Sequence, residues 1–127
     1  MQLTEFLSKD EIRGFTRRSD ARAAWVVIVS WASLLAVFWV VDTWTNPLTI
    51  VLAVVLLAGR QLGLAVIMHE CGHNTLFKSR ALNRFVGQWL GANPNFADMH
   101  KYAAGHSHHH KLAGTREDPD LPNYQAY

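Results

Sequence analysis

The sequence contains an uncharged apolar segment that is long enough to cross a lipid bilayer. Residues 23–41 include no Asp, Glu, Lys or Arg. As an α-helix they would be about 28 Å long, close to the roughly 30 Å thickness of the hydrocarbon layer. A second apolar segment covers residues 48–68 and is interrupted only by Arg60 and Gln61. Two such segments in succession predict a pair of membrane-spanning helices rather than the buried helix of a soluble protein.

The composition excludes several other classes of protein. Half of the 127 residues are hydrophobic, which excludes a disordered chain, and a single cysteine, Cys71, excludes a disulfide-stabilised scaffold. Charged residues make up 17% of the chain, fewer than the roughly 25% of an average soluble domain. The formal net charge of +2 is too small to indicate a nucleic-acid partner. We therefore expect an all-α membrane protein.

The distribution of basic residues predicts the orientation of the two spans. Residues 42–47, which join them, contain no Lys or Arg, whereas basic residues are present on the outer flank of each span. Positive charges near the ends of membrane spans favour the cytoplasmic side. We therefore expect a transmembrane helical hairpin with residues 1–22 and 69–127 in the cytoplasm and only the turn outside.

A shorter amphipathic helix is predicted after the second span. Apolar residues recur there with helical period, at Leu82, Phe85, Val86, Trp89 and Leu90. The opposite face would consist of Arg80, Asn83, Arg84, Gly87 and Gln88, and we expect Gly91 and Pro94 to end the helix. Either the membrane surface or the rest of the protein could cover the apolar face. The hairpin is thus expected to be followed by interfacial and cytoplasmic helices.

The seven histidines all lie after residue 68, and five of them form two groups with helical spacing. Residues spaced i, i+3 and i+4 lie on one face of a helix, so the rings of each group can converge on a common ion. The groups are His69 with His73, and His106 with His109 and His110. Imidazole nitrogens bind iron, zinc and copper more readily than calcium or magnesium. We therefore predict that these five histidines are metal ligands.

Other polar residues near the two groups carry weaker signals. His108 is turned by about 100° or more from each histidine of the second group, and we expect it and His100 to be surface residues. Asp98, Asp118 and Asp120 could accept the ring N–H of a metal-binding histidine. For Asp118 and Asp120, a turn capped by its own side chains is an equally good interpretation.

The first group also permits a different enzyme class. His69-Glu70-x-x-His73 has the pattern of zinc metalloproteases, in which two histidines hold zinc and the glutamate acts as general base. Intramembrane metalloproteases place this pattern beside or within a transmembrane helix. A single catalytic zinc needs only one further protein ligand, however, which leaves most of the second group unexplained. Two iron ions could use all five imidazoles, and a non-enzymatic protein that buffers or transfers zinc or copper is a third interpretation.

Both groups resemble the histidine boxes of the membrane-bound fatty acid desaturases. The segment His69-Glu-Cys-Gly-His-Asn-Thr-Leu-Phe77 resembles the first box of this family, and His106-x-x-His-His110 resembles the second. The residues that follow, as far as Leu121, resemble the corresponding segment of bacterial members. The close resemblance covers about residues 68–122, under half of the chain.

This resemblance implies a helical membrane enzyme with a cytoplasmic non-haem centre of two Fe ions. Such enzymes use O2 and two electrons, from a ferredoxin-like or cytochrome donor, to introduce a double bond into an acyl chain. The acyl chain is carried by a lipid, by CoA or by an acyl-carrier protein. The resemblance makes His69, His73, His106, His109 and His110 the iron ligands, and it implies a bacterial inner-membrane location. Related membrane hydroxylases share the histidine plan, so hydroxylation is an alternative reaction.

One part of the family pattern has no counterpart in this sequence. Family members carry a third histidine box after a second pair of spans, and residues 111–127 contain neither a histidine nor an apolar span. We therefore expect the chain to be the N-terminal part of a longer enzyme, with residues 69–127 as an incomplete desaturase domain. The isolated chain is not expected to desaturate a substrate.

Cysteine labelling in intact cells tests the predicted orientation. A thiol introduced by Thr45→Cys should react with a membrane-impermeant maleimide added outside, because the turn is expected to face outward. A thiol introduced by Lys78→Cys should react only after the cells are opened. The opposite pattern of labelling would show that the hairpin is inverted.

Overall fold

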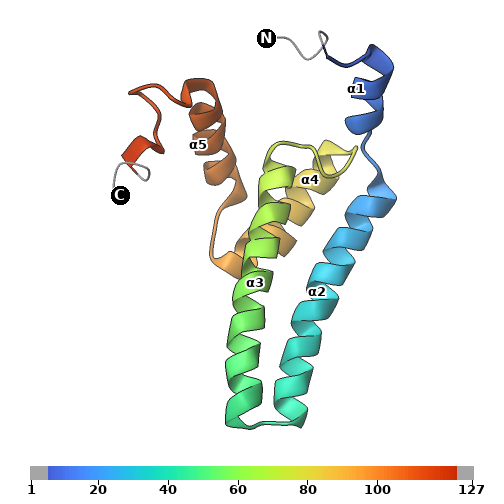
Figure 1. Cartoon of the computed structure of the whole chain (residues 1–127), viewed down its shortest axis with the longest axis vertical. Coiled ribbons are helices and arrows are strands. Elements are labelled where there is room, and N and C mark those ends of the chain that lie inside the picture. Colours follow the sequence, from blue (N-terminus) through green and yellow to red (C-terminus); the bar gives the residue numbers. More distant parts are fainter. Residues whose placement is uncertain (1–5, 123–127) are drawn as a thin grey trace.

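The computed structural model describes residues 6–122, which form helices joined by short connections (Figure 1). No strand is present within this range, so the predicted all-α class is confirmed. The helices are α1 (Lys9–Phe15), α2 (Asp20–Thr43), α3 (Pro47–Gly72), α4 (Arg80–Val86), the π-helix η2 (Gly87–Ala92), the 3-10 helix η3 (Asn93–Asn95) and α5 (Met99–Leu112). Residues 1–5 and 123–127, at the ends of the predicted cytoplasmic segments, lie outside the described residues.

Helices α2 and α3 form a hairpin that contains both predicted spans (Figure 1). The side chain of Asn46 begins α3 by accepting the backbone N–H groups of Leu48 and Thr49, and Pro47 occupies the first helical position. Each helix is long and apolar enough to cross a membrane, yet only 6% and 17% of their most apolar stretches are buried within the protein. The core helix of a soluble protein would be mostly buried. The exposed apolar surface of the hairpin therefore fits a lipid environment.

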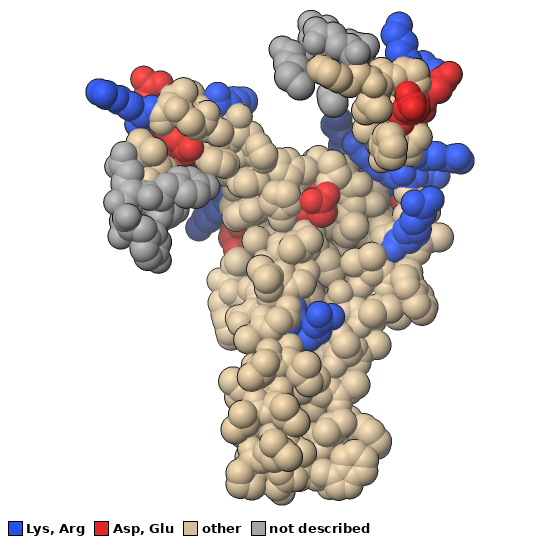
Figure 2. All heavy atoms as spheres, viewed as in Figure 1, with Lys and Arg blue, Asp and Glu red and all other residues tan. Residues whose placement is uncertain are grey.

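Charged groups gather at the end of the hairpin that lies away from the turn. Figure 2 shows that the turn-side half carries almost no charge on the face in view, whereas Lys, Arg, Asp and Glu surround α1 and α5. A bilayer that covers the apolar part of α2 and α3 would leave this charged end in the head-group layer and in water.

Helix α3 continues beyond residue 68, where the apolar pattern predicts the end of the span. Polar side chains do not interrupt the backbone hydrogen bonds of a helix, and the N–H of His73 still bonds to the carbonyl of His69 at 3.1 Å. The helix ends where Asn74 adopts a left-handed conformation with φ of 57°, which Asn tolerates better than most residues. The last turn of α3 therefore carries the first histidine group.

The apolar residues of α4 and η2 are exposed beside the hairpin. Leu82, Phe85 and Trp89 have exposed fractions of 44%, 58% and 59%. The protein itself therefore does not cover most of the predicted apolar face. These side chains fit a helix that lies at the membrane surface, which is one of the two arrangements that the sequence allows.

Two residues of the predicted polar face are instead buried. Asn83 is completely buried because its side chain accepts the N–H of Phe77 and donates to the carbonyls of Phe77 and Ser79. Gly87 is buried against α3 and α5, where an added Cβ would clash with Cys71 and Met99. The helical period identifies neither contact, because both depend on partners from other segments.

The prediction that Gly91 ends this helix is wrong. Helical turns continue through η2 and η3 to Asn95. Gly91 lies against the backbone of α3, where an added Cβ would be 2.8 Å from the nitrogen of Met68 and 3.1 Å from the carbonyl oxygen of Leu64. Glycine is needed at this position for the close approach of two helices rather than for a helix end. Pro94 also lies within the continued turns, near the start of η3.

Replacement of Gly91 tests this close contact. Gly91→Ala should destabilise the protein by about 1–3 kcal/mol, because the new methyl group must push apart two helical backbones. The matched control is Gly59→Ala, since an added Cβ at Gly59 meets no atom within 4 Å. Unfolding of the purified variants in detergent, followed by circular dichroism, measures the difference. Equal stability of the two variants would contradict the packing of η2 on α3.

Candidate metal centre

Four of the five predicted histidines meet at the charged end of the hairpin. We call His69, His73, His106 and His110 the histidine quartet; each offers a ring nitrogen, and all four nitrogens lie within 4.8 Å of one another. Nε2 of His106 is 2.9 Å from Nε2 of His69 and 3.0 Å from Nε2 of His110. Two nitrogens that bind one ion at about 2.0–2.1 Å lie about 3 Å apart. The spacing therefore fits ligands that share a metal ion.

The quartet combines one pair of histidines from α3 with one pair from α5. Within each pair the spacing is i, i+4, and the ring centroids are 4.7 Å apart for His69 and His73 and 4.5 Å apart for His106 and His110. Between the helices, the centroids of His69 and His106 are 4.7 Å apart. The spacing within each pair follows from helical geometry, whereas the contact between the pairs depends on how α3 and α5 pack.

Small residues bring α3 and α5 close together at this point. A Cβ added to Gly72 would lie only 3.3 Å from the Cβ of Ala103. Larger side chains at these positions would separate the helices and with them the two pairs of rings. Met99, at the start of α5, is buried and packs in the core together with Cys71 of α3.

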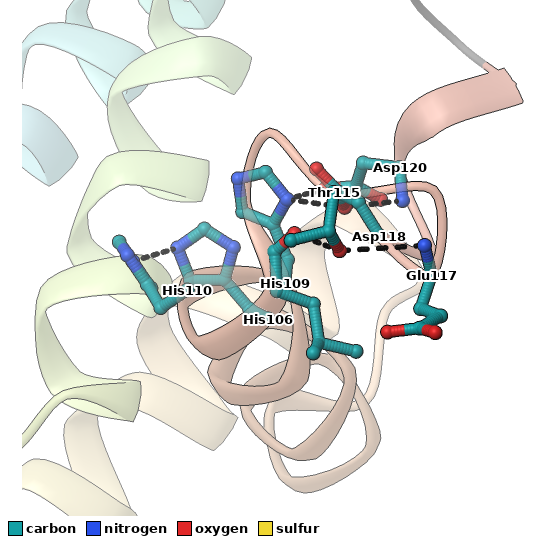
Figure 3. Close-up of polar contacts among 8 residues, drawn as sticks. His106, His109, His110, Thr115, Glu117, Asp118 and Asp120 are labelled. Atoms are coloured by element: carbon teal, nitrogen blue, oxygen red, sulfur yellow. Dashed lines mark hydrogen bonds and ion pairs between the residues drawn. The ribbon is translucent and has the colours of Figure 1, made fainter.

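His109 lies beside the quartet but is directed toward the segment that follows α5. Its Nδ1 is 2.7 Å from Oδ1 of Asp118 and 3.4 Å from Oδ2 of Asp120, and the Asp118 side chain is only 4% exposed. Figure 3 shows His109 turned toward these carboxylates, whereas His106 and His110 lie on the side of α5 that faces α3. The His109 ring also stacks on His106, with centroids 5.7 Å apart. Its role as a metal ligand stays a prediction.

The surroundings of the rings shift their protonation in different directions. Burial lowers the pKa of His73 and His106, and the neighbouring histidines of the quartet contribute in the same direction. The hydrogen bond to Asp118 raises the pKa of His109, and the same bond lowers the pKa of Asp118. A neutral imidazole keeps the lone pair that a metal requires. The quartet is therefore suited to binding a cation.

Glu70 is engaged by neighbouring side chains. Its Oε1 is 3.1 Å from Nδ1 of His69, and its Oε2 accepts a hydrogen bond from the hydroxyl of Thr75 at 2.6 Å. A carboxylate on one ring nitrogen orients the ring and leaves the other nitrogen for a metal. Because both of its oxygens have partners, Glu70 is poorly placed to act as the free base that the metalloprotease interpretation requires.

Two residues of the site do not stand out in the sequence. The ring of Tyr102 stacks on His106, with centroids 5.1 Å apart and an interplanar angle of 16°. Tyr102 precedes His106 by one helical turn, so the i, i+4 spacing could have identified it. Thr75 lies beyond the end of α3, where no helical period applies, and only the structure reveals its bond to Glu70.

Four other residues lie outside the centre. His100 and His108 are exposed, as expected from their positions, and Cys71 is buried in the core. Asp98 does not accept from a histidine ring; its side chain caps α5 by accepting the backbone N–H groups of His100 and Lys101.

Comparisons with known proteins agree with this architecture. A family model described as "Fatty acid desaturase" matches residues 45–127. The dihydrorhizobitoxine desaturase of Bradyrhizobium elkanii is 35% identical over 88 residues, which cover 68% of this chain and 24% of that protein. The beta-carotene ketolase of Paracoccus sp. (strain PC1) is 33% identical over 100 residues, or 75% of this chain and 40% of that protein.

A fungal relative matches over most of the chain. The Delta(12) fatty acid desaturase of Mortierella isabellina is 35% identical over 125 residues, which cover 89% of this chain and 31% of that protein. The chain thus spans less than half the length of these relatives. No solved structure is significantly similar to the chain.

Proposed function

Because this chain belongs to the fatty acid desaturase family, we propose that it supplies the first two histidine boxes of a membrane enzyme that introduces a double bond into an acyl chain. The observation that carries the proposal is the meeting of the quartet nitrogens within 4.8 Å at one end of an apolar hairpin. In the reaction, two adjacent CH2 groups each lose one hydrogen. One O2, two electrons and two protons are consumed, and two water molecules are released. A ferredoxin-like or cytochrome protein would supply the electrons.

The donor set fits the metal that this chemistry needs. Neutral imidazoles suit iron, zinc and copper, and zinc cannot change its oxidation state. We assign the quartet and His109 to two non-haem Fe ions, which when bound supply the activation of O2. Glu70 and Asp118 each accept from Nδ1 of a histidine, at His69 and His109 respectively. Both contacts would direct Nε2, with its lone pair, toward the metal.

The position of the quartet favours a substrate that comes from the membrane. The apolar surface of α2 and α3 ends just below the quartet, and the exposed apolar residues of α4 lie beside it. An acyl chain could therefore remain in a hydrocarbon environment close to the metal centre. We assign residues 23–41 and 48–68 to the bilayer and place the histidine boxes on its cytoplasmic side, in a bacterial inner membrane.

Product analysis tests the proposed reaction. The intact protein that carries this chain should generate an additional double bond in the fatty acids of a host that lacks it, as measured by gas chromatography and mass spectrometry. His106→Ala should abolish the product, whereas the exposed His108→Ala should retain it. An oxygenated product without a new double bond would contradict the proposal. So would peptide cleavage that depends on zinc and is lost in Glu70→Gln.

Metal titration tests the quartet independently of activity. Co2+ added to the purified chain should give the absorption bands of a cobalt–imidazole complex. His69→Ala or His106→Ala should weaken binding by more than the roughly 10–100-fold effect that is typical of residues that only support a ligand. His108→Ala is the matched control and should bind like the unaltered chain. Equal binding by all three variants would show that the quartet is not the metal site.

The same titration tests the support of His109 by Asp118. Asp118→Ala should weaken metal binding by about 10–100-fold, because the ring would lose the acceptor that orients it. Asp120→Ala is the control; its carboxylate is farther from Nδ1 and more exposed, and a smaller effect is expected. If both variants bind metal like the unaltered chain, His109 does not depend on this contact.

A further inference from the structure

An open groove lies where the connection between α1 and α2 meets the loop that follows α3. Its volume is about 210 Å3. One part of its lining is basic and another part is apolar. The basic part consists of Arg17, Arg18 and Arg22, and the apolar part of Ala23, Val26 and Leu76. The groove also reaches Glu70 and Thr75, but none of its arginines belongs to the metal centre.

The positive charge of this groove is not neutralised within the described part of the protein. Between residues 6 and 122, none of the three guanidinium groups takes part in an ion pair. The nearby carboxylates have other partners: Glu70 bonds to Thr75 and His69, and Asp20 accepts the backbone N–H of Lys78 at 2.8 Å. Figure 2 shows Lys and Arg side chains gathered where α1 meets α2. The groove therefore offers an unpaired cationic surface.

The groove lies at the level where the apolar surface of α2 begins. Arg22 directly precedes the uncharged residues 23–41, and the nearby Trp25 is 67% exposed. Trp is enriched at the boundary between hydrocarbon and head groups. The bond between Asp20 and the backbone of Lys78 holds the start of α2 beside the loop after α3, so both walls of the groove lie at this boundary.

We propose that this groove binds the head group of an anionic phospholipid. Guanidinium groups match the geometry of phosphate and can donate two parallel hydrogen bonds to it. The apolar wall would contact the first part of an acyl chain, which a free phosphate ion or an acidic protein surface does not provide. The site holds a lipid at the protein surface, and it requires neither the metal centre nor the proposed reaction.

Native mass spectrometry of the purified full chain in detergent tests the site. The unaltered chain should bind phosphatidylglycerol more tightly than phosphatidylcholine. The triple variant Arg17→Gln, Arg18→Gln, Arg22→Gln should lose this preference by on the order of tenfold to a hundredfold, since each basic residue near a membrane surface contributes appreciably to anionic lipid binding. The control removes the same charge elsewhere, by Lys101→Gln, Lys111→Gln and Arg116→Gln, and should keep the preference.

Further arms keep the result interpretable. Arg17 and Arg18 precede α2, so the double variant Arg17→Gln, Arg18→Gln replaces the triple variant if the latter does not reach the helix content of the unaltered chain. An unchanged preference in the arginine variant, or an equal loss in the control, would overturn the proposal. Glycerol 3-phosphate that binds as tightly as phosphatidylglycerol would indicate a site for soluble phosphates instead. Tighter binding of poly-glutamate would indicate an acidic protein partner.

Discussion

The distance between α3 and α5 determines whether the two histidine groups can meet. An imidazole extends only a short way from its backbone, so helices that carry facing pairs must pack closely. Gly72 and Ala103 permit this approach, and the absence of a side chain at Gly87 leaves room for Met99 and Cys71. These small residues bind nothing themselves. They set the separation at which ring nitrogens of different helices lie about 3 Å apart.

Polar contacts then hold the segment between α3 and α4 against the rest of the protein. The buried side chain of Asn83 bonds to the backbone at Phe77, and Asp20 bonds to the backbone of Lys78. Thr75 bonds to both the carbonyl and the side chain of Glu70. Because each contact anchors a different position, the last turn of α3 is supported from both sides. The first histidine group is thereby placed on a well-braced helix end.

Local periodicity predicts much of this structure, since the helical repeat depends on near neighbours in the chain. The two apolar segments and the pairs His69–His73 and His106–His110 follow from it directly. The same rule places His109 on the face of the second pair, but His109 is offset by about 60° from His106 and its ring nitrogen bonds to Asp118. The contacts of Gly91 and Asn83 depend on partners distant in sequence. Periodicity alone therefore could not have revealed them.

The direction of the two helices has an electrostatic consequence for the quartet. His69 lies in the last turn of α3 and His110 in the last turn of α5. The carbonyl end of a helix carries a partial negative charge equivalent to about half an electron, from the aligned peptide dipoles. Neutral imidazoles bring no charge of their own to compensate a divalent ion. Two converging helix ends would supply part of that compensation from the backbone, whatever side chains surround them.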